Sequence, residues 1–228
     1  MTIGIEATKA FEKEKTGVGW YTFYMVRELA KLIQPHNELK LYVNPNSIFN
    51  FQFSIFKQIP SLNDKNSNYS INALKWPPGI LWTQLRLSAE MITNPPDVLF
   101  IPSHLAPPIH PKKLVITIHD LAFKACPEVY SKQELLMQEW GIRQTLRNAW
   151  RIIVPSQFTK NEIYKWYPRY RKDTIYAVLH GVDHTIFKTP ARRVENHNSK
   201  IKNIVYIGRL ESKKNIVNLV KAFNFLCS

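Results

Sequence analysis

The run K-L-V-I-T-I-H-D, residues Lys113–Asp120, gives the clearest indication of the fold class. Its middle residues are aliphatic or β-branched, which is typical of a strand covered on both faces by helices. Such strands form parallel sheets, whose carboxyl ends carry the ligand groups of α/β proteins. His119 and Asp120 stand at that end, as either a ligand site or a half-buried histidine beside a helix-capping aspartate. His104, in a proline-rich loop after another expected strand, is a further candidate for substrate binding.

Strands and helices alternate on both sides of this run, which predicts an α/β fold with a Rossmann-like, doubly wound parallel sheet. The other expected strands are Ile3–Glu6, Glu38–Val43, Tyr69–Leu74, Asp97–Ile101, Arg151–Val154 and Thr174–Val178. Helices are expected from the turn at residues 16–20 to about Ile33, over Leu81–Met91 and Lys132–Ala149, and after Ser156.

Two of these helices carry more detailed predictions. The apolar side of the helix at Lys132–Ala149 is expected to hold Leu135, Leu136, Trp140, Ile142 and Leu146. In the helix after Ser156, the spacing of Thr159 and Glu162 is that of a capping box.

The pattern of strand and helix starts again near residue 200. Thr189–Lys200 is polar and basic without periodicity, which predicts a linker. Asn203–Ile207 predicts a strand, and apolar residues from Ile216 to Phe223 share one face of a following helix. We therefore expect a first domain at residues 1–188, a linker at 189–202, and the first strand and helix of a truncated second Rossmann-like domain at 203–228.

Two strand-to-helix turns are candidate anion sites, because a helix N-terminus presents free N–H groups and a positive dipole end. Gly17, Val18 and Gly19 form the first turn, where glycine lets a ligand approach the backbone closely. Arg209 and Lys214 flank the second turn and add two full charges. The expected ligand of that turn is a phosphate or diphosphate.

The formal net charge of +14 fits an anionic membrane surface, a polyanionic substrate or nucleic acid. The densest cluster, Lys165–Lys172, interleaves cations with aromatic rings and would suit nucleobases, lipid headgroups or simply water. No run approaches the roughly 18 apolar residues of a membrane span. Cys126 and Cys227 have no metal-type spacing, and a reducing compartment is expected. We expect a cytoplasmic protein, soluble or peripheral at the inner face of the membrane.

Five segments resemble, in order, those of glycosyltransferase family 4, whose members are retaining enzymes with the two-domain GT-B fold. They are T-G-V-G-W-Y-T at 16–22, I-H-D-L at 118–121, V-P-S-Q-F-T-K at 154–160, H-G-V-D at 180–183 and Y-I-G-R-L-E-S-K-K-N at 206–215. The agreement of order and spacing extends over nearly the whole chain. Trp20 stands where the family often has arginine, and His180 where it often has asparagine.

The resemblance implies transfer of a hexose, of mannosyl or glucosyl type, from a nucleotide-diphosphate sugar to a glycan or lipid-linked acceptor in envelope polysaccharide synthesis. It implies that Arg209 and Lys214 hold the donor diphosphate and that Gly17–Gly19 approach it from the facing domain. It also implies that His119 contacts the donor sugar near the reacting carbon, as the catalytic residue. Because fixed cations would stabilise the leaving diphosphate, no metal or cofactor is expected.

The family's donor-binding half, with its Glu-x7-Glu segment, is absent from this sequence. We therefore expect an incomplete fragment with little or no transferase activity of its own. Two alternatives remain open: a non-catalytic relic that binds a sugar or a partner, and a basic nucleic-acid-binding module. Salt-steep oligonucleotide binding without any response to nucleotide sugars would favour the second alternative.

Overall fold

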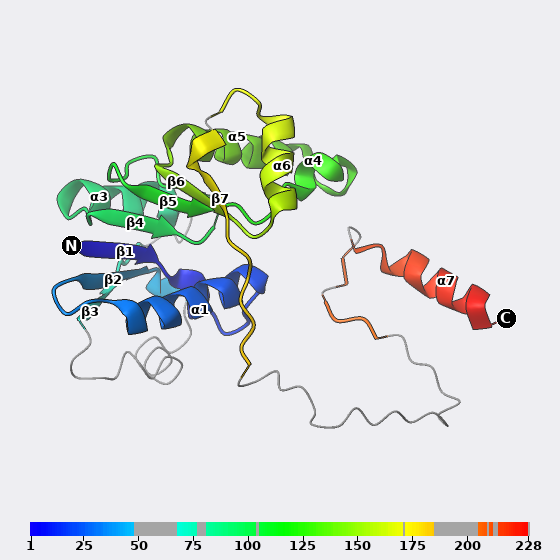
Figure 1. Cartoon of the computed structure of the whole chain (residues 1–228), viewed down its shortest axis with the longest axis horizontal. Helices are drawn as coiled ribbons and strands as arrows, with labels where there is room; N and C mark the ends of the chain where they lie inside the picture. The colour runs from blue at the N-terminus through cyan, green and yellow to red at the C-terminus, as the bar shows by residue number, and fades with distance from the viewer. Residues whose placement is uncertain are drawn as a thin grey trace.

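The computed structural model describes residues 1–47, 68–76, 81–103, 105–170, 172–184, 205–208, 210–211 and 214–227. These residues form a parallel sheet of seven strands in the order β3-β2-β1-β4-β5-β6-β7 (Figure 1). The strands are β1 Thr2–Glu6, β2 Glu38–Val43, β3 Tyr69–Ala73, β4 Val98–Ile101, β5 Leu114–Thr117, β6 Arg151–Val154 and β7 Ile175–Ala177. The predicted doubly wound sheet is confirmed, and each strand expected within it agrees to within one residue at either end.

The sheet reverses its winding beside β1, which pairs with β2 on one side and β4 on the other. From β1 the chain runs outward through β2 to β3. It then returns to β4 and runs outward in the opposite direction to β7. In sheets of this kind the ligand binds at the carboxyl ends of the strands next to that reversal.

Helices cover both faces of the sheet. They are α1 Gly17–Leu32, α3 Ser88–Thr93, α4 Ala122–Ala125, α5 Lys132–Asn148 and α6 Gln157–Trp166. Strand β4 shows the two faces: Phe100 packs in the core beneath α1, whereas Leu99 packs beneath α3. A third core cluster joins α5 and α6 to β6 through Ile142, Ile163 and Ile152. The predicted helix at residues 81–91 is a π-helical turn, Trp82–Leu87, that continues into α3.

The predicted apolar side of α5 is partly wrong. Ile142 and Leu146 are buried, but Leu136 and Trp140 are 72% and 48% exposed. The reason is geometric, because successive helical residues are about 100° apart and the sheet covers only one stripe of the helix. Leu136 and Trp140 lie beside the buried stripe rather than on it.

The predicted capping box of α6 is wrong by one turn. Ser156 is the N-cap, and its Oγ accepts a hydrogen bond from the Thr159 amide at 3.0 Å. Thr159 therefore lies inside the first turn, where it is buried. A complete capping box is found instead on α5, between Ser131 and Glu134.

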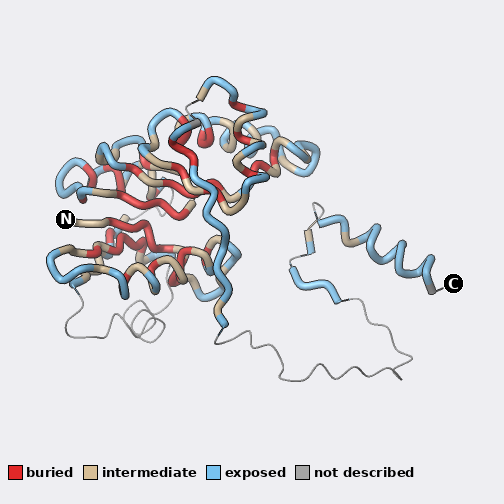
Figure 2. The backbone as a smooth tube through the Cα atoms, viewed as in Figure 1, coloured by how far each residue is buried: buried red, intermediate tan, exposed pale blue. Residues whose placement is uncertain are grey.

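The strand expected at residues 203–207 is not formed over its described part, Val205–Ile207. A strand needs a neighbour for its backbone hydrogen bonds, and the sheet pairings found among the described residues do not include this run. The expected helix is present as α7, Ile216–Cys227. Figure 2 shows α7 exposed over most of its length, from Val217 to Leu226.

Candidate functional site

The candidate site lies at the carboxyl ends of the strands beside the reversal of the sheet. His119 follows β5, and its Nε2 lies 2.8 Å from the carbonyl oxygen of Pro102, which follows β4. Because a carbonyl oxygen only accepts hydrogen bonds, Nε2 carries the ring proton and donates it. The imidazole thus bridges the ends of two strands at the position where α/β sheets bind ligands.

Three elements fix the orientation of His119. From α1, the Tyr21 ring meets the imidazole edge-on, with ring centroids 4.9 Å apart. The Tyr21 hydroxyl is itself 3.1 Å from Oγ1 of Thr117 at the end of β5. From α6, Thr159 Oγ1 donates a hydrogen bond to the backbone carbonyl of His119 at 3.4 Å. The histidine is therefore held by α1, β5 and α6 together.

Burial lowers the pKa of His119 below its ordinary value of 6.5. The Pro102 carbonyl acts in the opposite direction, and the nearby ring of His180 lowers the pKa further. At neutral pH the imidazole is consequently uncharged, with its proton on Nε2. Its other nitrogen, Nδ1, is then a hydrogen-bond acceptor.

The glycine turn begins α1, and its two glycines have different surroundings. The N-cap Thr16 accepts a hydrogen bond from the Gly19 amide at 3.4 Å. A Cβ on Gly19 would lie 2.9 Å from the Lys9 carbonyl oxygen, whereas a Cβ on Gly17 would meet nothing within 4 Å. The amides of Gly17 and Val18 are at the helix start, where no earlier helical carbonyl is available to them. Gly17 and Val18 thus form the open part of the turn, and Gly19 permits close packing.

Asp120 is exposed, and its Oδ1 accepts a hydrogen bond from the Ala122 amide at 3.0 Å. That bond satisfies the first amide of α4, whose N-cap residue is Leu121. The sequence left open a ligand pair or a capping aspartate beside a half-buried histidine, and Asp120 bonds to the helix start from one residue before the N-cap. A contact of Asp120 with substrate stays a prediction.

Comparison with known proteins identifies the family. The model for Glycosyltransferase Family 4 matches residues 16–186, which is more than half of the chain. The chain belongs to glycosyltransferase family 4. The resemblance seen in the sequence segments is thereby confirmed.

Individual relatives of this family-4 chain are distant. O-antigen chain mannosyltransferase B of Escherichia coli is 24% identical over 237 residues, which cover 97% of this chain and 60% of the relative. The solved structure of the Anabaena protein HepE in complex with UDP-glucose matches with a TM-score of 0.49 and 14% identity, over 84% of this chain and 47% of that one. The chain thus spans about 60% of the length of its curated relative.

The second predicted anion turn lies only partly within the described residues. Arg209 and His104 lie outside the described residues. Lys214 is exposed, and its backbone amide bonds to the Glu211 carbonyl at 2.9 Å in a local turn. Figure 1 shows α7, which follows Lys214, apart from the sheet. Diphosphate binding by Arg209, Lys214 and the glycine turn therefore stays a prediction.

The sequence did not identify His180 as a member of the site. Its ring lies roughly parallel to that of His119 at 6.1 Å between centroids, and 5.2 Å from the Tyr21 ring. The one available signal was its place in the H-G-V-D segment that resembles family 4. Periodicity gave none, because His180 follows the last strand of the sheet and reaches α1 only through the fold.

In the described part of the chain, no group of three or more His, Cys, Asp or Glu residues is arranged to hold a metal ion. The expectation that the family-4 chain needs no metal stays a prediction. No helix within the described ranges is long and apolar enough to cross a bilayer.

Proposed function

We propose that this chain is the acceptor-side part of a retaining glycosyltransferase that transfers a hexose, most simply mannose, from a nucleotide-diphosphate sugar to a glycan or lipid-linked acceptor. The observation that carries the proposal is His119, fixed at the carboxyl ends of β4 and β5 by Pro102 and against Tyr21 of α1. Family membership supports sugar transfer. The name of the Escherichia coli relative supports mannose as the sugar and a polysaccharide as the product.

The proposed chemistry breaks the bond between the anomeric carbon and a diphosphate oxygen, which leaves with the electron pair. An acceptor hydroxyl oxygen bonds to the same carbon, and its proton passes to the leaving diphosphate. Negative charge on that oxygen grows toward the transition state, so positive groups fixed beside it lower the barrier. The amides of Gly17 and Val18 and the dipole of α1 would contribute such groups. Arg209 and Lys214 would add full charges from the second turn, in place of a metal ion.

His119 would act on the sugar rather than on the diphosphate. Its Nε2 proton is engaged by the Pro102 carbonyl. Nδ1 is then available to accept a hydrogen bond from a hydroxyl of the donor hexose. An uncharged imidazole suits this role, because a protonated ring has no acceptor. Asp120 and His104 are proposed only as neighbours of the bound substrate.

A peripheral membrane contact would suit a lipid-linked acceptor. Leu136, Met137 and Trp140 are exposed on the outer side of α5, and Arg143 and Arg147 follow on the same helix. Apolar and aromatic side chains beside arginines are typical of helices that lie on anionic lipid surfaces. With the net charge of +14, this supports a place at the inner face of the membrane.

Donor binding tests the proposal directly. Amide signals of the ¹⁵N-labelled chain would be followed during titration with GDP-mannose and UDP-glucose, and with the free hexoses as controls. We expect the signals of Gly17, Val18 and His119 to shift with at least one nucleotide sugar and not with a free hexose. Because the chain alone is expected to bind weakly, the titration extends to millimolar nucleotide sugar. A folded chain that gives no shift at these residues even there would overturn the assignment.

We also propose that residues 1–228 act as part of a longer enzyme. The donor-side residues foreseen from the sequence, Arg209 and Lys214, are expected to need further protein around them to bind diphosphate tightly. The chain alone should therefore transfer little hexose, while a polypeptide of the relative's full length should turn over. Equal turnover by both would contradict this part of the proposal.

A further inference from the structure

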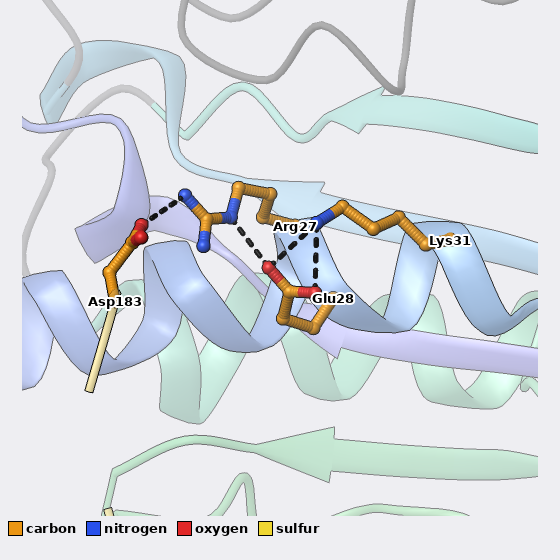
Figure 3. Close-up of polar contacts among 4 residues, drawn as sticks. All are labelled: Arg27, Glu28, Lys31 and Asp183. Carbon is orange, nitrogen blue, oxygen red and sulfur yellow. Dashed lines mark hydrogen bonds and ion pairs between the residues drawn. The ribbon is translucent and has the colours of Figure 1, made fainter. Parts of the chain in front are cut away.

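The segment at residues 178–184 follows the last strand of the sheet and lies against α1, which is far upstream in the sequence. It starts on the sheet, where the Val178 amide donates to the Val154 carbonyl at 2.8 Å. It ends on α1, where Arg27 Nη1 contacts Asp183 Oδ2 at 3.0 Å. Figure 3 shows the guanidinium between Asp183 and Glu28. Two elements that are far apart in the sequence are thus joined by one ion pair.

Three groups hold the Arg27 guanidinium in place. Its Nε donates to Glu28 Oε1 at 2.7 Å, and its centre lies 4.6 Å from the centroid of the Tyr24 ring. The side chain of Asp183 is only 8% exposed, against 25% for Arg27. An ion pair with a nearly buried carboxylate and a pre-positioned arginine is less screened than a free surface pair. Removing the arginine would leave a charge in a nearly dry place, which is unfavourable.

His180 precedes Asp183 by three residues, a stretch of about 10 Å at full extension. Fixing Asp183 therefore limits where the His180 ring can lie. The ring is found against Tyr21 and stacked at a 30° tilt on His119, although His180 is an exposed residue.

We propose that the Arg27–Asp183 ion pair is a positioning clamp that holds His180 beside His119 and thereby completes the site as a pair of imidazoles. Arg27 and Asp183 act through His180 and are positioning residues. The role of the clamp in sugar transfer rests on the proposed function. Its effect on the positions of the two histidines does not.

The pair of rings has a chemical consequence. Two imidazolium ions this close would repel each other, so the nearby His180 ring adds to burial in lowering the pKa of His119. The clamp therefore helps to keep His119 uncharged, with Nδ1 as an acceptor. The titratable and charged groups around the His119 ring are Lys9, Tyr21, Asp120 and His180.

The titration of the two histidines tests the clamp without any donor. NMR of the chain would follow the ring protons of His119 and His180 from pH 4.5 to 8.5, with the cross-relaxation between the two rings, in wild type, Arg27→Met and Asp183→Asn. Both variants should lose the ring-to-ring signal, and the pKa of His119 should rise toward 6.5 because the second ring and its cover have moved away. In the ring-to-ring signal the double variant should equal either single variant, since each substitution alone already breaks the Arg27–Asp183 ion pair.

Two further variants separate the clamp from a general effect on α1. Arg27→Lys keeps the charge and should retain part of the ring-to-ring signal. Lys31→Met removes a cation that pairs with Glu28 one turn further along the same helix and should behave as wild type. The proposal is overturned if Arg27→Met and Asp183→Asn leave both the signal and the His119 pKa unchanged, or if Lys31→Met changes them equally. Should Arg27→Met unfold, Asp183→Asn decides alone, because it keeps the size of the side chain. Failure of donor binding would leave this result untouched.

Discussion

His119 is the residue whose environment has the most direct effect on measurable behaviour. Burial holds its folded pKa below 6.5, while the unfolded chain titrates near that ordinary value. Between the two pKa values the unfolded state binds more protons, so the free energy of unfolding falls as pH falls through this window. Above the window the residue makes no such contribution.

His119→Gln is therefore expected to flatten this part of the pH profile. Urea unfolding at pH 7.5 and 5.5 would be compared for wild type and variant, and wild type should lose more stability at the lower pH. The other titrating groups are present in both proteins, so the difference between the profiles isolates His119. Identical pH slopes would mean that the pKa of His119 is not depressed in the folded chain.

The two glycines of the first turn should respond differently to alanine. Gly19→Ala places a Cβ 2.9 Å from the backbone carbonyl of Lys9 and should cost about 1–3 kcal/mol of unfolding free energy. Gly17→Ala meets open space and should be neutral or stabilising by up to about 1 kcal/mol, because alanine restricts the unfolded chain. Urea unfolding of both variants checks this. Equal losses would contradict the open surroundings assigned to Gly17.

The hydroxyl group of Tyr42 is buried without contributing a hydrogen bond to the described part of the core. Its ring is fully buried on β2, and among the described residues its hydroxyl has no hydrogen-bond partner. Burial accordingly raises its pKa well above 10. Tyr42→Phe should leave stability unchanged or raise it by about 1 kcal/mol, because the desolvated hydroxyl is removed and the ring is kept. A loss of more than 1 kcal/mol in urea unfolding would show that the hydroxyl is bonded after all.

At the level of helices and strands, the sequence was most informative where one interaction dominates. Buried parallel strands such as β5 are continuous apolar runs, and their limits follow from composition. Helix faces were harder, because α5 has more apolar residues than the sheet can cover, and the pattern could not say which were left outside. The cap of α6 was misplaced because Ser156, Thr159 and Glu162 offer two overlapping spacings. His180 joined the site through tertiary structure alone.

The surplus apolar side of α5 leads to a prediction about lipid binding. Replacing Met137 and Trp140 by Gln should weaken binding to anionic liposomes about tenfold, because two inserted apolar side chains are lost. Stability should change little, since both side chains are exposed. Leu32→Gln on α1 is the matched control, because Leu32 is 73% exposed on a different helix. An equal decrease in the control, or none in the α5 variant, would remove α5 as the lipid-binding face.

For the molecule as a whole, binding caused by the net charge of +14 has to be distinguished from binding by the apolar side chains of α5. Any protein this basic attracts polyanions at low salt, so binding to an oligonucleotide or to a charged liposome at low ionic strength distinguishes nothing. Nucleic-acid binding and membrane binding differ in their response to salt. Binding that depends on phosphate contacts alone weakens steeply as counterions accumulate. Insertion of apolar side chains from α5 does not depend on charge and is strengthened slightly by salt.

The protein should therefore keep measurable affinity for anionic liposomes at about 0.5 M salt, where the Debye length is only a few ångströms. At the same concentration its affinity for a single-stranded oligonucleotide should be lost. Sedimentation with liposomes and fluorescence anisotropy with the oligonucleotide, each from 0.05 to 0.5 M salt, would make the comparison. If liposome binding fell as steeply as oligonucleotide binding, charge would explain both. An oligonucleotide affinity that exceeded the liposome affinity at every salt concentration would favour the nucleic-acid-binding alternative over a membrane-associated transferase.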